Sequence, residues 1–297
     1  MQSTHEVYNI LSNCFPTFSS TCQPADLSIS KCQSWSNKLL LVQTSTQFQP
    51  NKILIRFFGN VSKVVEKEKE RRMFSEISRL NFGISQYSCT EYYRIEKYLE
   101  PTTSLSGLLM KEPKIISYFA QSLCDLHYNE DLNKALAEYS PISAFANKAL
   151  EKWGGCIIKE VPNWIQQCKT EQQREILNQY KGLLNPEFES YYKKTVSFCS
   201  NLVCSHNDIH AGNLLLLDNA KVILIDFEYM NFNPRALDLG TYASEICCNY
   251  GYPVFPLFSH EEEYRLTDAE IEFLCSEYLK CYHAKYYKGD ANKASPL

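Results

Sequence analysis

The feature that most constrains the fold is a polar stretch followed closely by two apolar runs. The stretch reads Ser205-His-Asn-Asp208-Ile-His-Ala-Gly-Asn213, and the apolar runs follow at 214–217 and 222–227. The residues between the runs, Asp-Asn-Ala-Lys, favour a tight turn, so the pattern predicts two short antiparallel strands. Such a hairpin folds Asp226, near the end of the second run, back beside the loop that carries Asp208 and Asn213.

The spacing of these three oxygen-bearing side chains points to one kind of chemistry. Asn213 follows Asp208 by five residues on the predicted loop, and Asp226 follows it by eighteen. Phosphoryl transfer needs a carboxylate that orients the attacking hydroxyl and oxygen ligands that hold Mg²⁺ against the phosphates. We therefore interpret Asp208 as the base or orienting residue, and Asn213 and Asp226 as metal ligands.

The same residues carry a resemblance to a known superfamily. The H-x-D-x-x-x-x-N loop, the hairpin and the Asp226-Phe ending resemble the protein-kinase superfamily. Asn207 stands where most protein kinases have Arg, and Glu228 stands where they have Gly, which is similar to choline, ethanolamine and aminoglycoside kinases. The continuation narrows this resemblance to the choline/ethanolamine kinase family: Ile225-Asp-Phe-Glu-Tyr229, Asn233-Pro-Arg-Ala-Leu-Asp238-Leu-Gly240 and Glu245.

The resemblance implies an α+β, two-lobed protein-kinase-like fold with a small N-lobe, built from an antiparallel sheet and one main helix, and a larger, mostly helical C-lobe. The residue pattern agrees, since β-prone segments at 39–42, 53–58 and 92–99 precede a helix-rich remainder, and helical spacing runs from 61 to 80. We expect residues 1–100 to form the nucleotide-binding lobe and 101–297 the catalytic and substrate-binding lobe. Within the polar segment 1–30, Val7, Ile10 and Leu11 are spaced as in an amphipathic helix.

The resemblance also implies where ATP binds. Arg56 occupies the family position for a phosphate-holding Arg, whose guanidinium suits a bidentate grip on phosphate, and Glu70 is its expected ion-pair partner. Ser36 and Asn37 lie in the expected phosphate-covering turn, which departs from the family because the first glycine of the chain is Gly59. Backbone groups of Lys97, Tyr98 and Leu99 are expected to contact adenine at the hinge.

The substrate site follows from the same match. A quaternary ammonium group cannot donate a hydrogen bond, so its recognition depends on aromatic faces and a nearby carboxylate. The resemblance implies Glu245 and Tyr250 at the cation site, with His210 near the substrate hydroxyl beside Asp208, and Glu228 as a further metal ligand. The family's C-terminal tryptophan-bearing helices have no match here, because the tryptophans are Trp35, Trp153 and Trp164. We expect those final helices to be missing, and three alternatives stay open: the chain is a fragment, the aromatic cage is built differently, or the pocket stays open.

Taken together, these matches imply ATP- and Mg²⁺-dependent phosphorylation of choline or ethanolamine, the first step of phosphatidylcholine or phosphatidylethanolamine synthesis, by a possible homodimer. Three alternatives stay open: an ethanolamine-preferring enzyme, an aminoglycoside-type or other small-molecule kinase, and a pseudokinase that acts as a binding module. A metal site formed by His206 and His210 is a further alternative, against which we interpret His206 as a packing residue.

Composition argues against several other classes of protein. The net charge of −4 and pI near 5.9 argue against a nucleic-acid-binding surface, which needs a dense stripe of Lys and Arg. The thirteen cysteines include no C-x-x-C pair, so neither a disulfide framework nor a zinc site is expected. Since the sequence also shows no secretion signal and no run of eighteen apolar residues, we expect a cytoplasmic protein without a membrane span.

Overall fold

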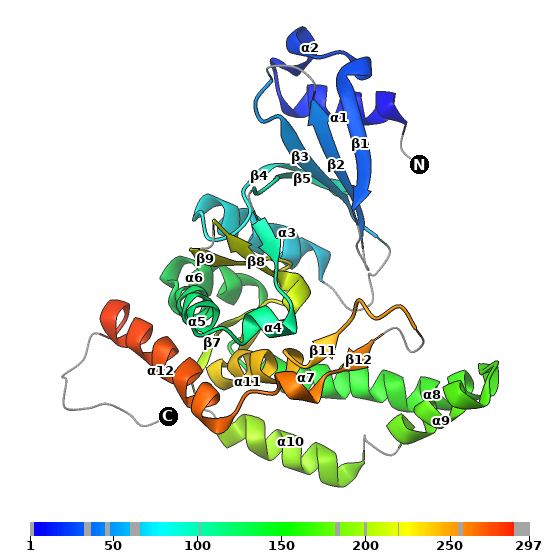
Figure 1. Cartoon of the computed structure of the whole chain (residues 1–297), viewed down its shortest axis with the longest axis vertical. Coiled ribbons are helices and arrows are strands. Elements are labelled where there is room, and N and C mark those ends of the chain that lie inside the picture. The colour runs from blue at the N-terminus through cyan, green and yellow to red at the C-terminus, as the bar shows by residue number, and fades with distance from the viewer. Residues whose placement is uncertain are drawn as a thin grey trace.

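The computed structural model describes residues 3–32, 37–44, 48–59, 66–100, 102–181, 185–198, 201–218, 220–254 and 258–287. A sheet-rich N-terminal part stands above a larger helical part, with the main N-terminal helix at their junction (Figure 1). This arrangement matches the predicted segregation of strands and helices. The predicted boundary near residue 100 stays a prediction, and Pro101 lies outside the described residues.

The N-terminal part is built on a five-stranded antiparallel sheet in the order β1-β2-β3-β5-β4. The strands are β1 (Leu27–Cys32), β2 (Lys38–Thr44), β3 (Lys52–Phe57), β4 (Gln86–Cys89) and β5 (Tyr93–Lys97). The strands predicted at 39–42, 53–58 and 92–99 are therefore confirmed as β2, β3 and β5. Because β3 and β5 are neighbours, Arg56 lies directly opposite Arg94, which matters for the site below.

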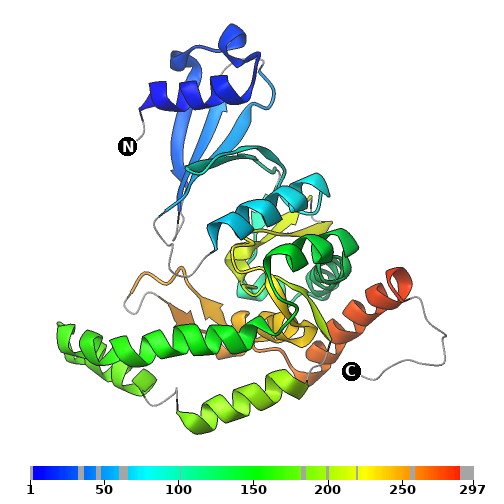
Figure 2. The ribbon, with the colours of Figure 1, turned by 180° about the vertical axis from the view of Figure 1, so that it is seen from behind.

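Residues before the sheet form helices that cover one of its faces (Figure 2). They are α1 (Thr4–Cys14), α2 (Phe18–Thr21) and the short turn η1 (Pro24–Asp26). A capping box between Ser3 and Glu6 starts α1, and Val7, Leu11 and Phe18 are buried with apolar side chains of the sheet. The amphipathic spacing noted in this segment is thus confirmed as a helix.

Helix α3 (Lys67–Arg79) joins the sheet to the rest of the molecule. Met73, Phe74 and Ile77 on this helix are buried in the same apolar cluster as side chains of the C-terminal part. Its position is therefore fixed by packing on the larger part as well as by the sheet. The helical spacing predicted for residues 61–65 lies outside the described residues.

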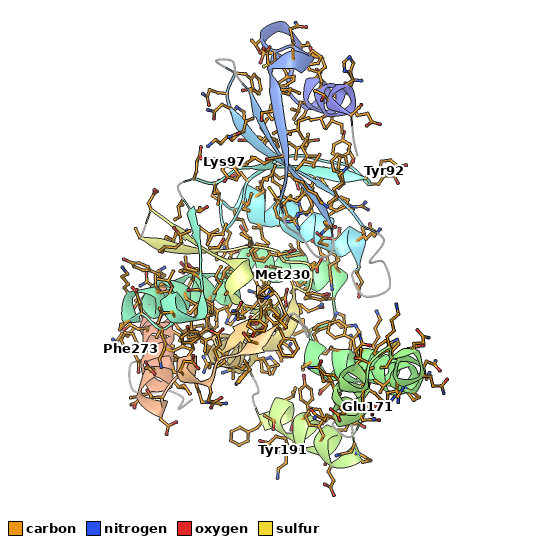
Figure 3. The ribbon with its side chains drawn as sticks, turned by 45° about the vertical axis from the view of Figure 1, so that its right-hand side comes forward. Tyr92, Lys97, Glu171, Tyr191, Met230 and Phe273 are labelled. Carbon is orange, nitrogen blue, oxygen red and sulfur yellow. The ribbon has the colours of Figure 1, made fainter. Side chains whose placement is uncertain are left out.

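The C-terminal part is mostly helical. It contains α4 (Gly107–Met110), α5 (Pro113–Tyr128), α6 (Glu130–Tyr139), α7 (Phe145–Ala149), the π-helical turn η2 (Leu150–Gly154), α8 (Gly155–Gln167), α9 (Glu171–Lys181), α10 (Pro186–Phe198), α11 (Arg235–Glu245), the turn η4 (Glu262–Tyr264) and α12 (Asp268–Lys285). Helix α5 supplies the centre of the core, with Phe119, Leu123 and Leu126 fully buried. Helices α8 to α10 extend sideways as an arm, which carries Glu171 and Tyr191 (Figure 3).

Short strands within this helical part position the site. Strand β7 (Leu202–Ser205) pairs with β10 (Asn231–Pro234), and β8 (Leu214–Leu217) pairs with both β9 (Lys221–Leu224) and β6 (Thr102–Ser104). The register Leu214 opposite Leu224 confirms the predicted hairpin. A last pair, β11 (Cys248–Asn249) and β12 (Ser259–His260), follows α11.

Two findings concern the described ranges as a whole. None of their helices combines the length and the apolar character that crossing a membrane requires. The cysteines that the structure describes are all free thiols.

Candidate active site

The loop between β7 and β8 is held by one buried carboxylate. Asp238, on α11, accepts hydrogen bonds from the backbone N–H groups of His206 and Asn207, both at 2.8 Å, and lies 3.0 Å from His127 Nε2. Burial by itself would raise the pKa of Asp238, but the hydrogen bond to His127 and the backbone donors lower it, so the carboxylate is ionised. Asp238 therefore braces this loop from the first turn of α11.

Asn207 closes the same loop with its side chain. Its backbone has a φ of 67°, in the left-handed region that Asn tolerates better than most residues. Its Nδ2 donates to the carbonyl oxygens of Tyr229 at 3.0 Å and Ser205 at 3.2 Å, and its Oδ1 accepts from Asn233 Nδ2 at 2.6 Å. The residue that replaces the Arg of protein kinases therefore ties the loop to β10 and to the segment after Asp226.

His206 is a packing residue, as expected. It is fully buried, its Nε2 bonds to the Ile225 carbonyl at 2.9 Å, and its ring lies 5.0 Å from that of Phe227. Because the bond to Ile225 occupies Nε2, this nitrogen does not join His210 in a metal site.

Asp208 and Asn213 form a direct pair at the exposed side of the loop. Asn213 Nδ2 donates to Asp208 Oδ2 at 2.8 Å and to the Asp208 carbonyl at 2.9 Å, so these two bonds do not use the Asn213 Oδ1 atom. Asn213 is 6% exposed, whereas the Asp208 side chain is 34% exposed. Burial is the main cause that raises the pKa of Asp208, with a contribution from Asp226, while His210 and Asn213 oppose the rise.

The hairpin returns Asp226 to this pair. The Ile225 N–H donates to the Asn213 carbonyl at 3.0 Å, which fixes the end of β9 against the loop. Asp226 follows with a φ of 65°, and its Oδ2 lies 3.5 Å from Nη1 of Arg56, 170 residues earlier in the chain. The hairpin therefore returns Asp226 to the loop, as the spacing predicted, and Asp226 also meets Arg56 of the N-terminal sheet there.

Negative charge accumulates at this point. Burial, followed by repulsion from Asp226, Glu70 and Asp208, raises the pKa of Glu228 to about 7. A group of carboxylates whose charges raise the pKa of Glu228 suits a divalent cation, and Mg²⁺ typically binds one or two carboxylates together with phosphate oxygens. No three His, Cys, Asp or Glu side chains within the described ranges form a metal site by themselves, so the Asn213 Oδ1 and phosphate oxygens would have to complete the ligand set.

We expect Glu228→Gln to stabilise the metal-free protein above pH 7. A carboxyl group whose folded pKa is raised binds its proton more tightly when folded, so the wild-type protein loses stability as pH rises from about 4.5 to about 7. After allowance for solvent screening of this partly exposed group, the gain is about 1 to 2 kcal/mol at pH 8. Urea unfolding in the presence of a chelator at pH 5 and pH 8 measures this gain in stability. Equal stability of wild type and Glu228→Gln at pH 8 would contradict the repulsion of Glu228 by its neighbouring carboxylates.

Arg56 belongs to a buried network that corrects one expectation. Glu70 was expected to pair with Arg56, but it binds Arg94 Nη1 at 3.3 Å. Arg56 instead binds Glu96 through Nε at 2.9 Å and Asp226 through Nη1. The physical reason lies in the sheet register, because Arg94 is opposite Arg56 and takes the position nearer to α3. Burial would lower the pKa of Arg56, but Glu96 and Asp226 raise it above its ordinary value.

The other residues that were predicted to contact the nucleotide differ in how far their polar groups are already used within the protein. The Asn37 Oδ1 accepts from the Gly59 N–H at 3.1 Å, which joins the predicted turn to the end of β3, while Ser36 lies outside the described residues. The Lys97 N–H donates to the Ser85 carbonyl at 2.8 Å, so that donor is already used within the N-terminal part; Figure 3 shows Lys97 at one end of β5 and Tyr92, which precedes the strand, at the other. The Leu99 carbonyl accepts from Thr102 Oγ1 at 3.2 Å, and Tyr98 lies near the Lys52 ammonium group, 5.7 Å from the ring centroid.

The predicted substrate residues gather beside Asp208. The Nδ1 of His210 accepts from the Gly212 N–H at 3.1 Å, and its Nε2 lies 3.8 Å from Asp208 Oδ2. The His210 ring packs edge-on against Tyr250 at 5.8 Å, and the Tyr250 hydroxyl donates to Glu245 Oε2 at 2.7 Å. A chain of contacts thus connects Asp208 to the acidic and aromatic groups at the end of α11.

Two aromatic residues near the carboxylates were not among the predicted site residues. Tyr229 follows Glu228, and its ring lies edge-on at 5.6 Å from Trp153 on η2, which packs in the same way on Phe145. Burial, followed by the charges of Glu228 and Asp208, raises the pKa of Tyr229 to about 12. The family match at Tyr229 was the available signal for that residue, whereas no local pattern marks Trp153.

Comparison with known sequences supports one family. The family model described as choline/ethanolamine kinase matches residues 30–295. The choline kinase of Schizosaccharomyces pombe is 25% identical over 73% of this chain and 50% of its own length, and the human choline/ethanolamine kinase is 25% identical over 84% of this chain and 58% of its own. The chain therefore spans little more than half the length of these curated relatives.

Comparison with solved structures concerns the fold. The crystal structure of choline kinase from Cryptosporidium parvum Iowa II aligns with a TM-score of 0.75 at 19% identity, covering 95% of this chain and 80% of that chain. The predicted two-lobed, protein-kinase-like α+β fold is thus confirmed. The family model matches residues 30–295, which include the loop, the hairpin and most of the N-terminal sheet. This chain therefore belongs to the choline/ethanolamine kinase family.

Proposed function

We propose that this chain transfers the γ-phosphoryl group of ATP to the hydroxyl of a small amino alcohol, choline or ethanolamine. The observation that carries the proposal is that Asp226 contacts Arg56 on one side, while the backbone bond of its neighbour Ile225 to Asn213 keeps it close to the Asp208–Asn213 pair on the other. Family membership and the names of the matched relatives support the choice of substrate. The phosphomonoester product would enter phospholipid synthesis.

Each side chain has a role that its geometry allows. Asp208 orients the substrate hydroxyl and receives its proton as the oxygen attacks the γ-phosphorus and the bond to the bridging β,γ-oxygen breaks. Asn213 keeps the Asp208 carboxylate in place through Nδ2, and Arg56 holds phosphate oxygens. Asn213 Oδ1, Asp226 and Glu228 would hold Mg²⁺, which when bound neutralises charge on the phosphates.

The nucleotide and the substrate would approach from different parts of the chain. We assign the phosphate and adenine contacts to residues 1–100, through Asn37, Arg56 and the backbone of Tyr98 and Leu99, and the remaining groups to residues 101–297. Ser36 and Lys97 stay proposed contacts, the latter through groups other than its N–H, which Ser85 accepts.

The cation of the amino alcohol would be recognised by the groups beside Asp208. Glu245 supplies a carboxylate, and Tyr250, Tyr229 and Trp153 supply aromatic rings on either side of the loop. His210 would contact the substrate hydroxyl. This arrangement offers the aromatic faces that a quaternary ammonium needs, although the chain carries no tryptophan after Trp164.

We expect Trp153→Leu to raise KM for choline by about 2- to 30-fold, since a cation–π contact is worth about 0.5 to 2 kcal/mol. KM for ATP should stay within twofold, because Trp153 lies on the substrate side. Trp164→Leu is the matched control, as Trp164 is on the arm helix α8 and is 43% exposed. An unchanged KM for choline in Trp153→Leu would remove this residue from the site.

A substrate panel tests the function itself. Wild-type protein is supplied with radiolabelled ATP and, separately, with choline, ethanolamine, an aminoglycoside and a macrolide. We expect phosphorylated choline or ethanolamine, and the ratio of the two rates gives the preference. Transfer to an antibiotic with both amino alcohols inert would favour an aminoglycoside-type kinase, and binding of MgATP without transfer to any acceptor would favour a pseudokinase.

A further inference from the structure

The N-terminal sheet contains a carboxylate whose two arginine contacts suggest a role in nucleotide binding. We propose that Glu96, on β5, is the positioning residue that holds Arg56 for contact with the phosphates of ATP, in the place expected for Glu70 on α3, which acts on Arg56 through its charge but forms its hydrogen bond with Arg94. The inference rests on the proposed function, since Arg56 is a phosphate ligand only if the chain binds ATP.

The geometry of Glu96 is unusual for a structural ion pair. Its side chain is fully buried, and a single oxygen, Oε1, accepts from Arg56 Nε at 2.9 Å and from Arg94 Nε at 2.8 Å. The other oxygen, Oε2, is buried with no hydrogen-bond partner in the described part of the chain. Because Arg56 is gripped through Nε, its terminal nitrogens remain directed toward Asp226, where Nη1 is 3.5 Å from Oδ2.

The sheet register explains why a carboxylate is needed here. Arg56 on β3 and Arg94 on β5 are directly opposite each other, and like charges in such a pair repel. Glu96 is two residues beyond Arg94 on the same face of β5, at the diagonal position from which one carboxylate reaches both guanidinium groups. Burial by itself would raise the pKa of Glu96, but Arg56 and Arg94 lower it, so the group is ionised.

The side chains of helix α3 that contact this network do so at Arg94. Glu70 binds Arg94 Nη1 at 3.3 Å, and the Arg94 guanidinium stacks 3.5 Å from the centroid of the Phe74 ring. Arg94 is thereby fixed to the helix, and Arg56 is fixed to the sheet through Glu96. Arg56 is thus held by a hydrogen bond within its own sheet, whereas Glu70 on the helix reaches it through charge alone.

Calorimetric titration with MgATP, in the absence of any acceptor, tests this assignment. We expect Glu96→Gln to weaken binding by about 10- to 100-fold, because a neutral amide directs N–H groups as well as an oxygen at the two arginines. Glu70→Gln should change Kd by less than threefold. In an Arg56→Met background, Glu96→Gln should add less than threefold, since a residue that acts through Arg56 has nothing left to position.

A charge-balanced variant distinguishes a loss of protein stability from a loss of the correct position of Arg56. Glu96→Gln leaves two buried arginines short of a counter-charge and can unfold the protein, so Arg94→Met/Glu96→Gln is made as well, which removes one buried charge of each sign. We expect this double variant to unfold at a temperature close to that of Arg94→Met and to bind MgATP about 10- to 100-fold more weakly than Arg94→Met does.

The outcomes distinguish a failure of the Glu96 inference from a failure of the proposed function. Equal MgATP affinity of Arg94→Met and the double variant would overturn the role of Glu96, and so would a loss in Glu70→Gln as large as in Glu96→Gln. Either result leaves the proposed function standing if wild-type protein phosphorylates an amino alcohol. Wild-type protein that binds no MgATP would overturn both the proposed function and this inference.

Discussion

Replacing Asp208 with Ala is expected to lower turnover of the amino alcohol by about 10²- to 10⁴-fold, the range typical of a positioned general base. The carboxylate is partly exposed, and Asn213 orients it through the bond to Oδ2. Its removal should leave KM for ATP nearly unchanged, because Arg56 and the proposed adenine contacts belong to the N-terminal part.

The matched comparison for this prediction uses amide substitutions. Asp208→Asn keeps the size of the side chain and removes its basicity, so its turnover should fall nearly as far as that of Asp208→Ala. Asp218→Asn, in the exposed turn of the hairpin, is the control and should behave as wild type. Near-normal formation of the phosphomonoester by Asp208→Asn would refute the role of Asp208.

Asp226→Asn is expected to lower turnover by about 10²- to 10⁴-fold and to raise the Mg²⁺ concentration needed for half-maximal rate. Loss of a metal ligand removes several kcal/mol of charge stabilisation at the phosphates, which corresponds to that range of rates. Asn is the informative substitution, because Asp226 has a φ of 65° and Asn adopts this backbone conformation with less strain than Ala does.

Two measurements on Asp226→Asn distinguish the metal role from a folding defect. Thermal unfolding should be close to that of wild type in the absence of Mg²⁺, since the substitution also relieves repulsion of Glu228. A Mg²⁺ titration of the initial rate should be shifted to higher concentration. An unshifted titration would show that Asp226 is not a ligand of the ion.

The parts of the site that the sequence predicted are those with local signals. The apolar runs and the intervening turn predicted the hairpin, and the hairpin alone was enough to bring Asp226 to Asp208 and Asn213. Asp238 lies in the motif that carried the family match, and its bonds to the backbone of His206 and Asn207 brace the loop.

The parts that sequence reasoning missed depend on pairing across long stretches of chain. Glu70 was assigned to Arg56 by its place on the helix, but the register of β3 against β5 puts Arg94 opposite Arg56, and Arg94 forms the hydrogen bond with Glu70. Trp153 comes near Tyr229 only because α7 packs on β10, where the Ala146 N–H donates to Asn233 Oδ1 at 3.0 Å. Neither register nor packing of distant elements is encoded in local periodicity.

The account depends most on one divalent ion that contacts both the loop and the end of the hairpin. A crystal structure with Mn²⁺ and a non-hydrolysable ATP analogue, with the ion located by its anomalous signal, tests this directly. We predict one ion bound to Asn213 Oδ1, to Asp226 and to phosphate oxygens, at distances near the ~2.1 Å typical of a small oxygen-bound divalent cation. An ion bound without Asp226, or a nucleotide lying away from Arg56, would contradict the account.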